Sequence, residues 1–596
     1  MKRLVCFFIY FTLLQQQMCI ANETYVSKDV LDNIDEVILE YLNLMNVPGA
    51  AVGIVVNDEI VLSNGYGFRN QEHSLQVTKL TQFPIGSLSK AFTTFVLGQL
   101  VDEGLIDWDD KIIDHIPYFK LKDPVTTYSI TLRDYLTHIS GYPRHDASWF
   151  NSGISRKDMI KRLRYLDPFT QFRHEFFYQN LGYMIASNLA ENVTGKTWEE
   201  LASEKILEPL GLKNTNFSIV DLQKNADHSI GYRDYKAGVS STNFVNVDTV
   251  SSSGGMNSSL EDMLKWIKVL MKKGDGYIEE ETWNEIVSPH VVSNMIKNTC
   301  PGVEQIVPME SYGLGWFVLL YRGHIALFHN GNIEGFSSSI LLFPKENIGI
   351  VALSNKHLTP FPNIVSAIIA DKLLNLNNIA WLEMLKAFVD YSKDDIQKNQ
   401  HTHMHKHENT HPSHPLSEFQ GVYYNDGYGN VEVVVNNGHL EVFFNNMTIL
   451  LNHYHYNVFE ISSEDNNQML NGLKFTFNEN VYGDINVIQI PFEPKVSDIV
   501  FLKQKDKNIF SENYLKKFIG KYNYQGFGIK IELIDNSLTV NVFGRSPLIL
   551  IPERNLMFKF KGDDNNTIQF ISNDKDEIIA AQLIQSNNNT FTAYRD

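Results

Sequence analysis

Ser87 and Lys90, three residues apart, are the residues of this chain best suited to covalent chemistry. They open a stretch in which apolar residues recur at helical spacing, so their side chains should lie one turn apart on one helix face. A serine hydroxyl attacks a carbonyl only when a nearby base removes its proton, and burial lowers the pKa of a lysine toward that role. N–H groups at the start of a helix also stabilise an oxyanion. The pattern therefore predicts that Ser87 is a nucleophile activated by Lys90.

The same Ser-x-x-Lys spacing occurs at Ser572 and Lys575, so spacing alone does not identify the nucleophile. A serine at the start of a helix also has a purely structural role, because its hydroxyl can cap the helix. Ser572 lies among polar, strand-like residues, whereas Ser87 follows a Pro-Ile-Gly turn and begins the helical pattern. This context favours Ser87.

Tyr178 and Asn180 form a second candidate element, in a loop that enters another helical pattern. A tyrosine close to Lys90 would act as a general base or proton shuttle, and the amide of Asn180 would hydrogen-bond a substrate. The Tyr-x-Asn spacing also occurs elsewhere in the chain, so Tyr178 considered alone could equally be a half-buried aromatic residue.

His329, Gly331 and Asn332 form a third candidate element, between two predicted strands. His329 would take the place of a cationic residue that orients the acyl group or the catalytic hydroxyls. Gly331 permits close backbone approach, and the N–H of Asn332 would be a second donor to an oxyanion. The alternative interpretation is a hairpin turn with a surface histidine.

Mixed helical and strand patterns extend over residues 26–393 and indicate an α/β or α+β domain that would position the three elements, and the α+β class is the one predicted. Two apolar runs joined by Asn57 and Asp58 predict a hairpin. The helix that begins with Ser87 should be amphipathic and end at Gly104, since glycine is a natural C-terminal cap. Later strands indicate a mixed antiparallel sheet, and they are expected at residues 325–328, 337–343 and 348–354.

Alternating histidines interrupt this pattern at residues 401–407, a polar tract that reads as a linker because it offers no apolar face. On an extended chain these histidines point to one side and could capture zinc or copper. A flexible tract fixes no ligand set, so no metal site is predicted. The candidate ligands considered are His401, His403, His405 and His407.

After the tract, short strands rich in Val, Ile, Phe and Tyr indicate all-β structure. A motif that begins Leu416-Ser-Glu-Phe and continues to Gly427-Tyr-Gly recurs as Leu515-Lys-Lys-Phe and Gly526-Phe-Gly. This repetition predicts two copies of one small β-barrel. The predicted division is a signal peptide at 1–21, a hydrolase-like domain at 22–395, a His-rich linker at 396–415, and barrels at 416–505 and 506–596.

The N-terminus carries Lys2 and Arg3 before an apolar run and a small residue, Ala21, which is typical of a signal peptide and predicts a secreted, extracellular protein. No later apolar run is long enough for a membrane span. The formal charge of −18 argues against a nucleic-acid partner. Acceptor sequons for N-glycosylation occur at Asn22, Asn192, Asn216, Asn257, Asn446, Asn565 and Asn588.

In chain order, the three elements resemble the three-motif signature of class C β-lactamases, serine D-alanyl-D-alanine peptidases and related esterases. The resemblance implies a helical subdomain set against a five-stranded antiparallel sheet flanked by helices, with a cleft between them. The repeats look like the lipocalin-like barrels that some members append. Stretches between the motifs are also similar to the family, and they are residues 131–143, 208–215 and 253–263.

The resemblance implies a secreted serine hydrolase that cleaves an amide or ester of a small-molecule or peptide substrate through an acyl-enzyme on Ser87, without a cofactor. His329 replaces the lysine of the Lys-Thr-Gly motif found in many β-lactamases, so rapid β-lactam turnover is not predicted. The alternative function is an extracellular matrix or binding protein, in a mineralised matrix for instance, whose acidic residues associate with calcium. The sequence predicts no oligomeric state.

Overall fold

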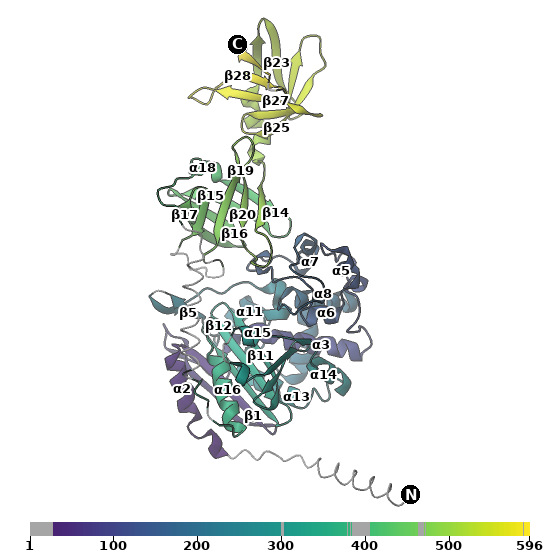
Figure 1. The fold of residues 1–596 in the computed structure, drawn as a ribbon, viewed down its shortest axis with the longest axis vertical. Coiled ribbons are helices and arrows are strands. Elements are labelled where there is room, and N and C mark those ends of the chain that lie inside the picture. The colour runs from purple at the N-terminus through teal and green to yellow at the C-terminus, as the bar shows by residue number, and fades with distance from the viewer. Residues whose placement is uncertain are drawn as a thin grey trace, which may run out of the picture.

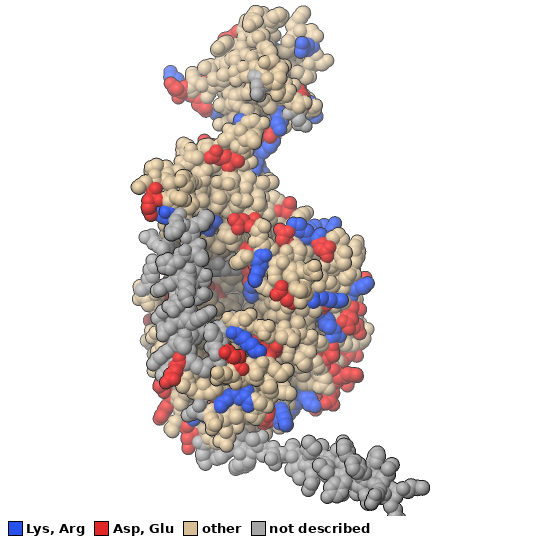
Figure 2. All heavy atoms as spheres, viewed as in Figure 1, with Lys and Arg blue, Asp and Glu red and all other residues tan. Residues whose placement is uncertain are grey.

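An α+β domain and two β-barrels follow one another along the long axis of the molecule (Figure 1). The computed structural model describes residues 28–235, 237–299, 303–377, 379–381, 383, 406–462, 470, 472–587 and 589–596. The predicted signal peptide lies outside these residues, as does most of the His-rich tract. On the face shown in Figure 2, acidic and basic side chains are interspersed over the α+β domain, so the negative net charge does not gather in one patch there.

The α+β domain is built on an antiparallel sheet that has nine strands in the described part of the chain, four more than the resemblance implies. The additional strands extend both edges. Asn57 and Asp58 form the predicted hairpin turn, and both have positive φ, as a tight turn of this kind requires. The strand order is β3 (Leu75–Gln76), β2 (Glu59–Asn70), β1 (Gly49–Val56), β13 (Ile348–Ser354), β12 (Phe336–Phe343), β11 (His324–Ile333), β10 (Phe317–Tyr321), β9 (Met309–Tyr312) and β8 (Val291–Val292).

Helices cover both faces of this sheet and create two apolar cores. On one face, α2 (Ile34–Leu44) and α16 (Phe361–Leu373) pack over the alternate residues Val52 and Ile54 of β1. On the other face, α13 (Leu260–Met271) joins a larger core that continues into the helical subdomain. That subdomain includes α3 (Ser89–Asp102), α6 (Leu132–Leu136), α7 (Arg156–Arg162), α8 (Leu181–Thr194), α12 (Ser251–Gly254) and α14 (Glu280–Val287).

The predicted helix after Ser87 is α3, but the prediction that it is amphipathic was wrong. Its residues from Ser89 to Leu100 are buried on every side, including Lys90 and Thr93. Thr93 meets the cost of burial by donating to the carbonyl of Ser252, 2.6 Å away. The helix therefore passes through the domain interior and carries its polar side chains into a buried site.

The two repeats form two closed barrels of eight strands each, as the repetition predicts. Equivalent tyrosines make the same contact in each: Tyr423 donates to the carbonyl of Phe419 at 2.8 Å, and Tyr522 donates to that of Phe518 at 2.9 Å. Barrel 1 consists of β14 (Gly421–Asn425), β15 (Gly429–Asn436), β16 (His439–Phe444), β17 (Met447–His455), β18 (Val458–Ile461), β19 (Lys474–Glu479), β20 (Ile485–Ile490) and β21 (Ile499–Lys503). Barrel 2 consists of β22 (Gly520–Tyr524), β23 (Phe527–Ile534), β24 (Ser537–Val542), β25 (Leu548–Arg554), β26 (Met557–Phe560), β27 (Asp563–Ser572), β28 (Ile578–Ile584) and β29 (Thr590–Arg595).

Barrel 1 packs against the helical subdomain of the α+β domain, and its interior belongs to the same apolar core cluster. The turn between β16 and β17 supplies two hydrogen bonds across this interface. Asn445 donates to the carbonyl of Ala147 at 2.7 Å, and Asn446 donates to that of Asn151 at 3.0 Å. The loop before α7 is therefore held by a domain that begins more than 250 residues later. None of the helices in the described ranges is long and apolar enough to cross a membrane.

Candidate active site

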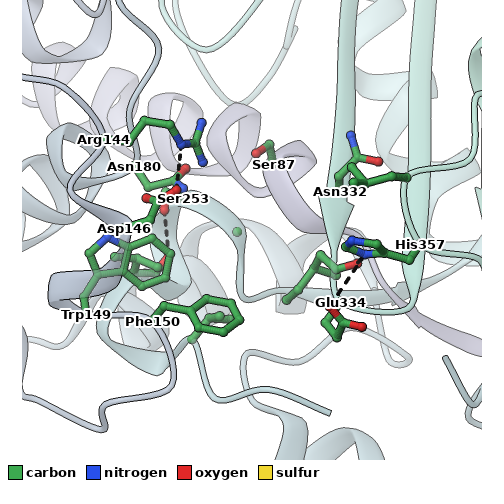
Figure 3. A pocket seen from close by; sticks show the side chains of 15 residues that line it. Ser87, Arg144, Asp146, Trp149, Phe150, Asn180, Ser253, Asn332, Glu334 and His357 are labelled. Carbon is green, nitrogen blue, oxygen red and sulfur yellow. Dashed lines mark hydrogen bonds and ion pairs between the residues drawn. The ribbon is translucent and has the colours of Figure 1, made fainter. Parts of the chain in front are cut away.

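The three predicted elements meet beside a pocket of about 360 Å³ between the helical subdomain and the sheet. Ser87, Asn180 and Asn332 line this pocket. Figure 3 shows Ser87 between two walls, one carrying Asn180 and the other carrying Asn332. The lining does not include the other four predicted residues: Lys90, His329 and Gly331 are buried, and Tyr178 is half-buried. The fold therefore brings together residues separated by about two fifths of the chain length.

Ser87 lies in a short 3₁₀ turn, Gly86–Leu88, that leads directly into α3. Lys90 is fully buried one turn later, and its Nζ is 3.2 Å from the Oγ of Ser87. Burial lowers the pKa of Lys90 well below its ordinary value; Arg144 adds to this effect and Asp146 opposes it. The ammonium form is thus disfavoured, which is what a proton acceptor for serine needs.

The other two contacts of Lys90 define the orientation of its amine. Its Nζ lies 2.8 Å from the Oδ1 of Asn180 and 2.8 Å from the carbonyl oxygen of Ser253, and both oxygens can only accept. A neutral amine has two N–H groups and one lone pair. If both N–H groups bind these oxygens, the lone pair faces the hydroxyl of Ser87.

Tyr178 lies half-buried beside this pair, and the Nζ of Lys90 lies 4.7 Å from the centre of its ring. Its hydroxyl oxygen is buried and interacts with Ser87, although the two groups form no hydrogen bond of ordinary geometry. Burial raises the pKa of Tyr178, and the neighbouring Ser87 and Arg144 partly oppose the rise. Tyr178 is therefore a neutral phenol near pH 7, suited to relaying a proton rather than acting as a phenolate base.

Two glycines bring the third element against the turn that carries Ser87. A Cβ atom on Gly331 would lie 2.0 Å from the carbonyl oxygen of Ile85. Gly86 has φ of +55°, and a Cβ atom there would lie 2.8 Å from the backbone nitrogen of Asn332. Only glycine permits this approach. The backbone of Asn332 is consequently adjacent to the Ser87 turn, where a second oxyanion donor is expected.

His329 lies inside the protein rather than on a hairpin surface, and only 1% of it is exposed. Its Nδ1 is 2.7 Å from the carbonyl oxygen of Asn330, and its Nε2 is 3.2 Å from the hydroxyl of Tyr312. Burial, reinforced by Lys90, lowers the pKa of His329 to about 3. His329 is therefore neutral at physiological pH, so any role in orienting the acyl group or the catalytic hydroxyls depends on hydrogen bonding rather than on charge.

The pocket also contains charged residues that the sequence motifs did not identify. Arg144 and Asp146 form an ion pair, with Nε and Oδ2 2.6 Å apart, on the wall formed by the helical subdomain (Figure 3). On the opposite wall, Glu334 pairs with Arg233 at 2.8 Å and lies 3.8 Å from His357. These residues flank the pocket but have no recognisable local spacing, so only the assembled fold places them there.

Barrel 1 directly supports the wall that carries Arg144 and Asp146. His145, between them, is fully buried in the left-handed conformation, and its N–H donates to the carboxylate of Glu493 at 2.9 Å. Its Nε2 lies 2.9 Å from the carbonyl oxygen of Asp167, which can only accept, so Nε2 carries the proton. Its Nδ1, 2.7 Å from the hydroxyl of Tyr428, then accepts from that hydroxyl.

The remaining predicted sites are the glycosylation sequons and the histidine tract. Asn257 was predicted as a glycosylation acceptor, but the structure contradicts this because it is fully buried and its side chain donates to Asn216 and Ser218. Asn216 is half-buried, whereas Asn192, Asn446 and Asn565 are exposed. Asn22 and Asn588 lie outside the described residues, as do three of the four tract histidines; His407 is exposed. Within the described ranges, His, Cys, Asp and Glu side chains form no group of three that could hold a metal ion.

Comparison with known proteins identifies families and relatives that this chain resembles. Residues 35–373 match the Beta-lactamase family, and residues 405–503 match a domain of unknown function, DUF3471. The chain is 28% identical over 346 residues to Protein flp of Staphylococcus aureus (strain NCTC 8325 / PS 47), which covers 57% of this chain and 66% of that protein. It is 29% identical over 347 residues to Unguisins hydrolase ungD' of Aspergillus campestris (strain IBT 28561), which covers 56% and 63%, respectively.

These matches span just under two thirds of the length of either curated relative. The fold is also similar to that of the octameric penicillin-binding protein homologue from Pyrococcus abyssi, with a TM-score of 0.52 and 20% sequence identity. That similarity covers 87% of this chain and 99% of the other. At this identity it concerns the fold alone.

Proposed function

The chain belongs to the β-lactamase family, and from this premise we propose that it is a serine hydrolase that cleaves an amide or ester bond through an acyl-enzyme on Ser87. The observation that carries the proposal is the environment of Lys90. A fully buried amine, with two carbonyl acceptors and the Ser87 hydroxyl around it, is arranged to accept a proton from serine.

In the first step, the Oγ of Ser87 attacks the substrate carbonyl and its proton passes to the Nζ of Lys90. The electron pair of the carbonyl double bond moves to oxygen and forms a tetrahedral oxyanion. The backbone N–H groups of Ser87 and Asn332 are the expected donors to this oxyanion. The proton then moves from Lys90, directly or through the hydroxyl of Tyr178, to the leaving amine or alcohol as its bond to carbon breaks.

In the second step, water attacks the ester formed on Ser87. Lys90, neutral again after the first step, accepts a proton from this water, and Tyr178 again provides a relay. Collapse of the second tetrahedral species breaks the bond to Ser87, which recovers its proton, and releases the acid. The chemistry needs no metal or organic cofactor at any step.

A small-molecule or peptide acyl compound is the proposed substrate class. The pocket of about 360 Å³ has the size of a small-ligand site, and its walls combine the aromatic rings of Trp149 and Phe150 with the ion pair of Arg144 and Asp146. A relative bears the name Unguisins hydrolase, which supports hydrolysis as the reaction type. Secretion remains part of the proposal and rests on the signal-peptide pattern at residues 1–21.

The test is turnover of an activated ester, p-nitrophenyl acetate, by the purified chain and its variants. Ser87→Ala and Lys90→Ala are expected to remove turnover, with a loss of at least about 10²-fold for the loss of the base. Ser572→Ala is the matched control because Ser572 and Lys575 have the same spacing in barrel 2. Equal turnover by Ser87→Ala and the control would refute the proposed reaction.

A further inference from the structure

Barrel 2 contains a cavity, of about 330 Å³, outside the proposed active site. Most of its lining is aliphatic or aromatic, contributed by strands all around the barrel. The interior of barrel 1 is instead filled by buried aromatic rings, among them Phe444, Phe475 and Phe501, and the half-buried Phe492 stacks on Phe444 with ring centres 4.8 Å apart. Barrel 2 also has a buried aromatic core, which includes Phe518, Phe558 and Phe570, but its side chains leave this cavity unfilled.

The strand registers show that substitutions at equivalent positions create this cavity. The last two strands of each barrel pair with each other. In barrel 1 Ile488 of β20 is paired with Phe501 of β21, and in barrel 2 Ala581 of β28 is paired with Ala593 of β29. Phe501 and Ala593 are equivalent because each lies two positions before the residue that pairs with the matching tyrosine of its barrel. These tyrosines are Tyr423 in barrel 1 and Tyr522 in barrel 2. Barrel 2 therefore has two alanines where barrel 1 has a phenylalanine and an isoleucine.

At two further equivalent positions, barrel 2 has a smaller side chain than barrel 1. Phe475, which pairs with Phe459, corresponds to Ile568, which pairs with Phe558. Val442 of barrel 1 and Val540 of barrel 2 are equivalent, because each pairs with the matching residue of the preceding strand. Phe444 and Val542 each lie two residues after these valines and therefore correspond. All four smaller residues of barrel 2 line the cavity. Two lining positions change in the other direction, from Ile461 to Phe560 and from Ile499 to Phe591, and the cavity of barrel 2 remains open beside them.

The two barrels also differ in whether another domain covers the end at which the cavity lies. In barrel 1, Tyr428 lies at this end and is buried against His145 of the α+β domain. In the repeated Gly-aromatic-Gly motif, the matching residue of barrel 2 is Phe527, which is 70% exposed, and nearby Phe543 is fully exposed. No domain of the described chain covers this end of barrel 2.

One cationic side chain, Arg545, stands in the cavity lining together with Ser546. Arg545 follows β24, is exposed, and forms no ion pair with any carboxylate whose side chain the structure describes. An apolar cavity with one free guanidinium at its edge matches a ligand with a hydrocarbon body and one anionic group.

We propose that barrel 2 binds a medium-chain fatty acid, with its hydrocarbon chain among Ala581, Ala593 and Ile568 and its carboxylate paired with Arg545. This site is separate from Ser87 and does not depend on the proposed reaction. It gives the second repeat a binding role, whereas the first repeat packs against the hydrolase-like domain.

The experiment is calorimetric titration of the full-length protein with decanoate below its micellar concentration. The Ala581→Ile/Ala593→Phe variant restores the side chains of barrel 1 and is expected to weaken decanoate binding at least tenfold. Arg545→Gln is expected to weaken decanoate several-fold while leaving decanol unchanged. Lys575→Gln, which removes an exposed cation at the opposite end of the barrel, is the matched control and should bind decanoate like the wild type.

Circular dichroism and turnover of the activated ester check that each variant is folded. If the double variant misfolds, Ala593→Leu provides a smaller filling of the same cavity with the same expected direction. The proposal is overturned if the wild type does not bind decanoate, or if a folded, filled variant binds it with unchanged affinity. Equal binding of decanoate and decanol, with no effect of Arg545→Gln, would overturn the assignment of the anionic group.

Discussion

Glu493 of barrel 1 is expected to support the active site from a distance, and its replacement by alanine tests this prediction. Only 5% of Glu493 is exposed, and its carboxylate accepts the N–H of fully buried His145 at 2.9 Å. Glu493→Ala leaves this N–H without its acceptor, at a cost of about 1–3 kcal/mol. The cost falls on the docked state of the loop that carries Arg144 and Asp146.

If the whole cost appears as loss of the docked loop in the enzyme–substrate complex, kcat/KM for the ester falls by about 5- to 150-fold. Tm should fall by about 2–6 °C, since each kcal/mol corresponds to roughly 2 °C in a domain of this size. Glu493→Gln retains an oxygen acceptor and should lose less of both. The assays are steady-state ester hydrolysis and differential scanning calorimetry.

Glu432→Ala is the matched control, because Glu432 is an exposed carboxylate on β15 of the same barrel. It should leave kcat/KM and Tm close to those of the wild type. If Glu493→Ala behaves like Glu432→Ala in both assays, barrel 1 does not position the loop and the reasoning is refuted.

Three other predictions follow from the site itself. Burial lowers the pKa of Lys90, and the neutral amine is the active form. A pH profile of kcat/KM should therefore fall as the pH drops through a pKa well below the ordinary lysine value. A profile whose only limb lies near that ordinary value would contradict this prediction. His329, with a pKa of about 3, is neutral across the working range, so His329→Gln should leave the position of that limb unchanged, and a displaced limb would assign the titration to His329. Gly331→Ala places a Cβ atom 2.0 Å from the carbonyl oxygen of Ile85. The variant should lose about 1–3 kcal/mol of stability in thermal unfolding and most of its ester turnover in kinetic assays. A Tm equal to that of the wild type would contradict the close approach.

Much of the fold was predictable because its signals are local. The turn at Asn57 and Asp58, the strands of the central sheet and the repeated barrel motif all depend on residues close in sequence, and the structure contains each of them. The burial of α3 was not predictable from its periodicity, since its polar residues face other buried elements rather than solvent. A helix surrounded on all sides has no solvent face for a pattern to reveal.

The candidate site was predictable only in part, for the same reason. Ser87 and Lys90 lie within one helical turn, so their proximity follows from spacing. Arg144 and Asp146 are placed by His145, whose partner Glu493 is 348 residues away, and no local pattern encodes that contact. The protonation state of His329 also depends on burial, which its sequence neighbours did not indicate.

The central claim, an activated nucleophile at Ser87, is tested most directly by reaction of the purified protein with a fluorophosphonate and identification of the labelled peptide by mass spectrometry. The account predicts one label on Ser87, absent from Ser87→Ala and strongly reduced in Lys90→Ala. Absence of label on folded wild-type protein, or label that persists in Ser87→Ala, would contradict it.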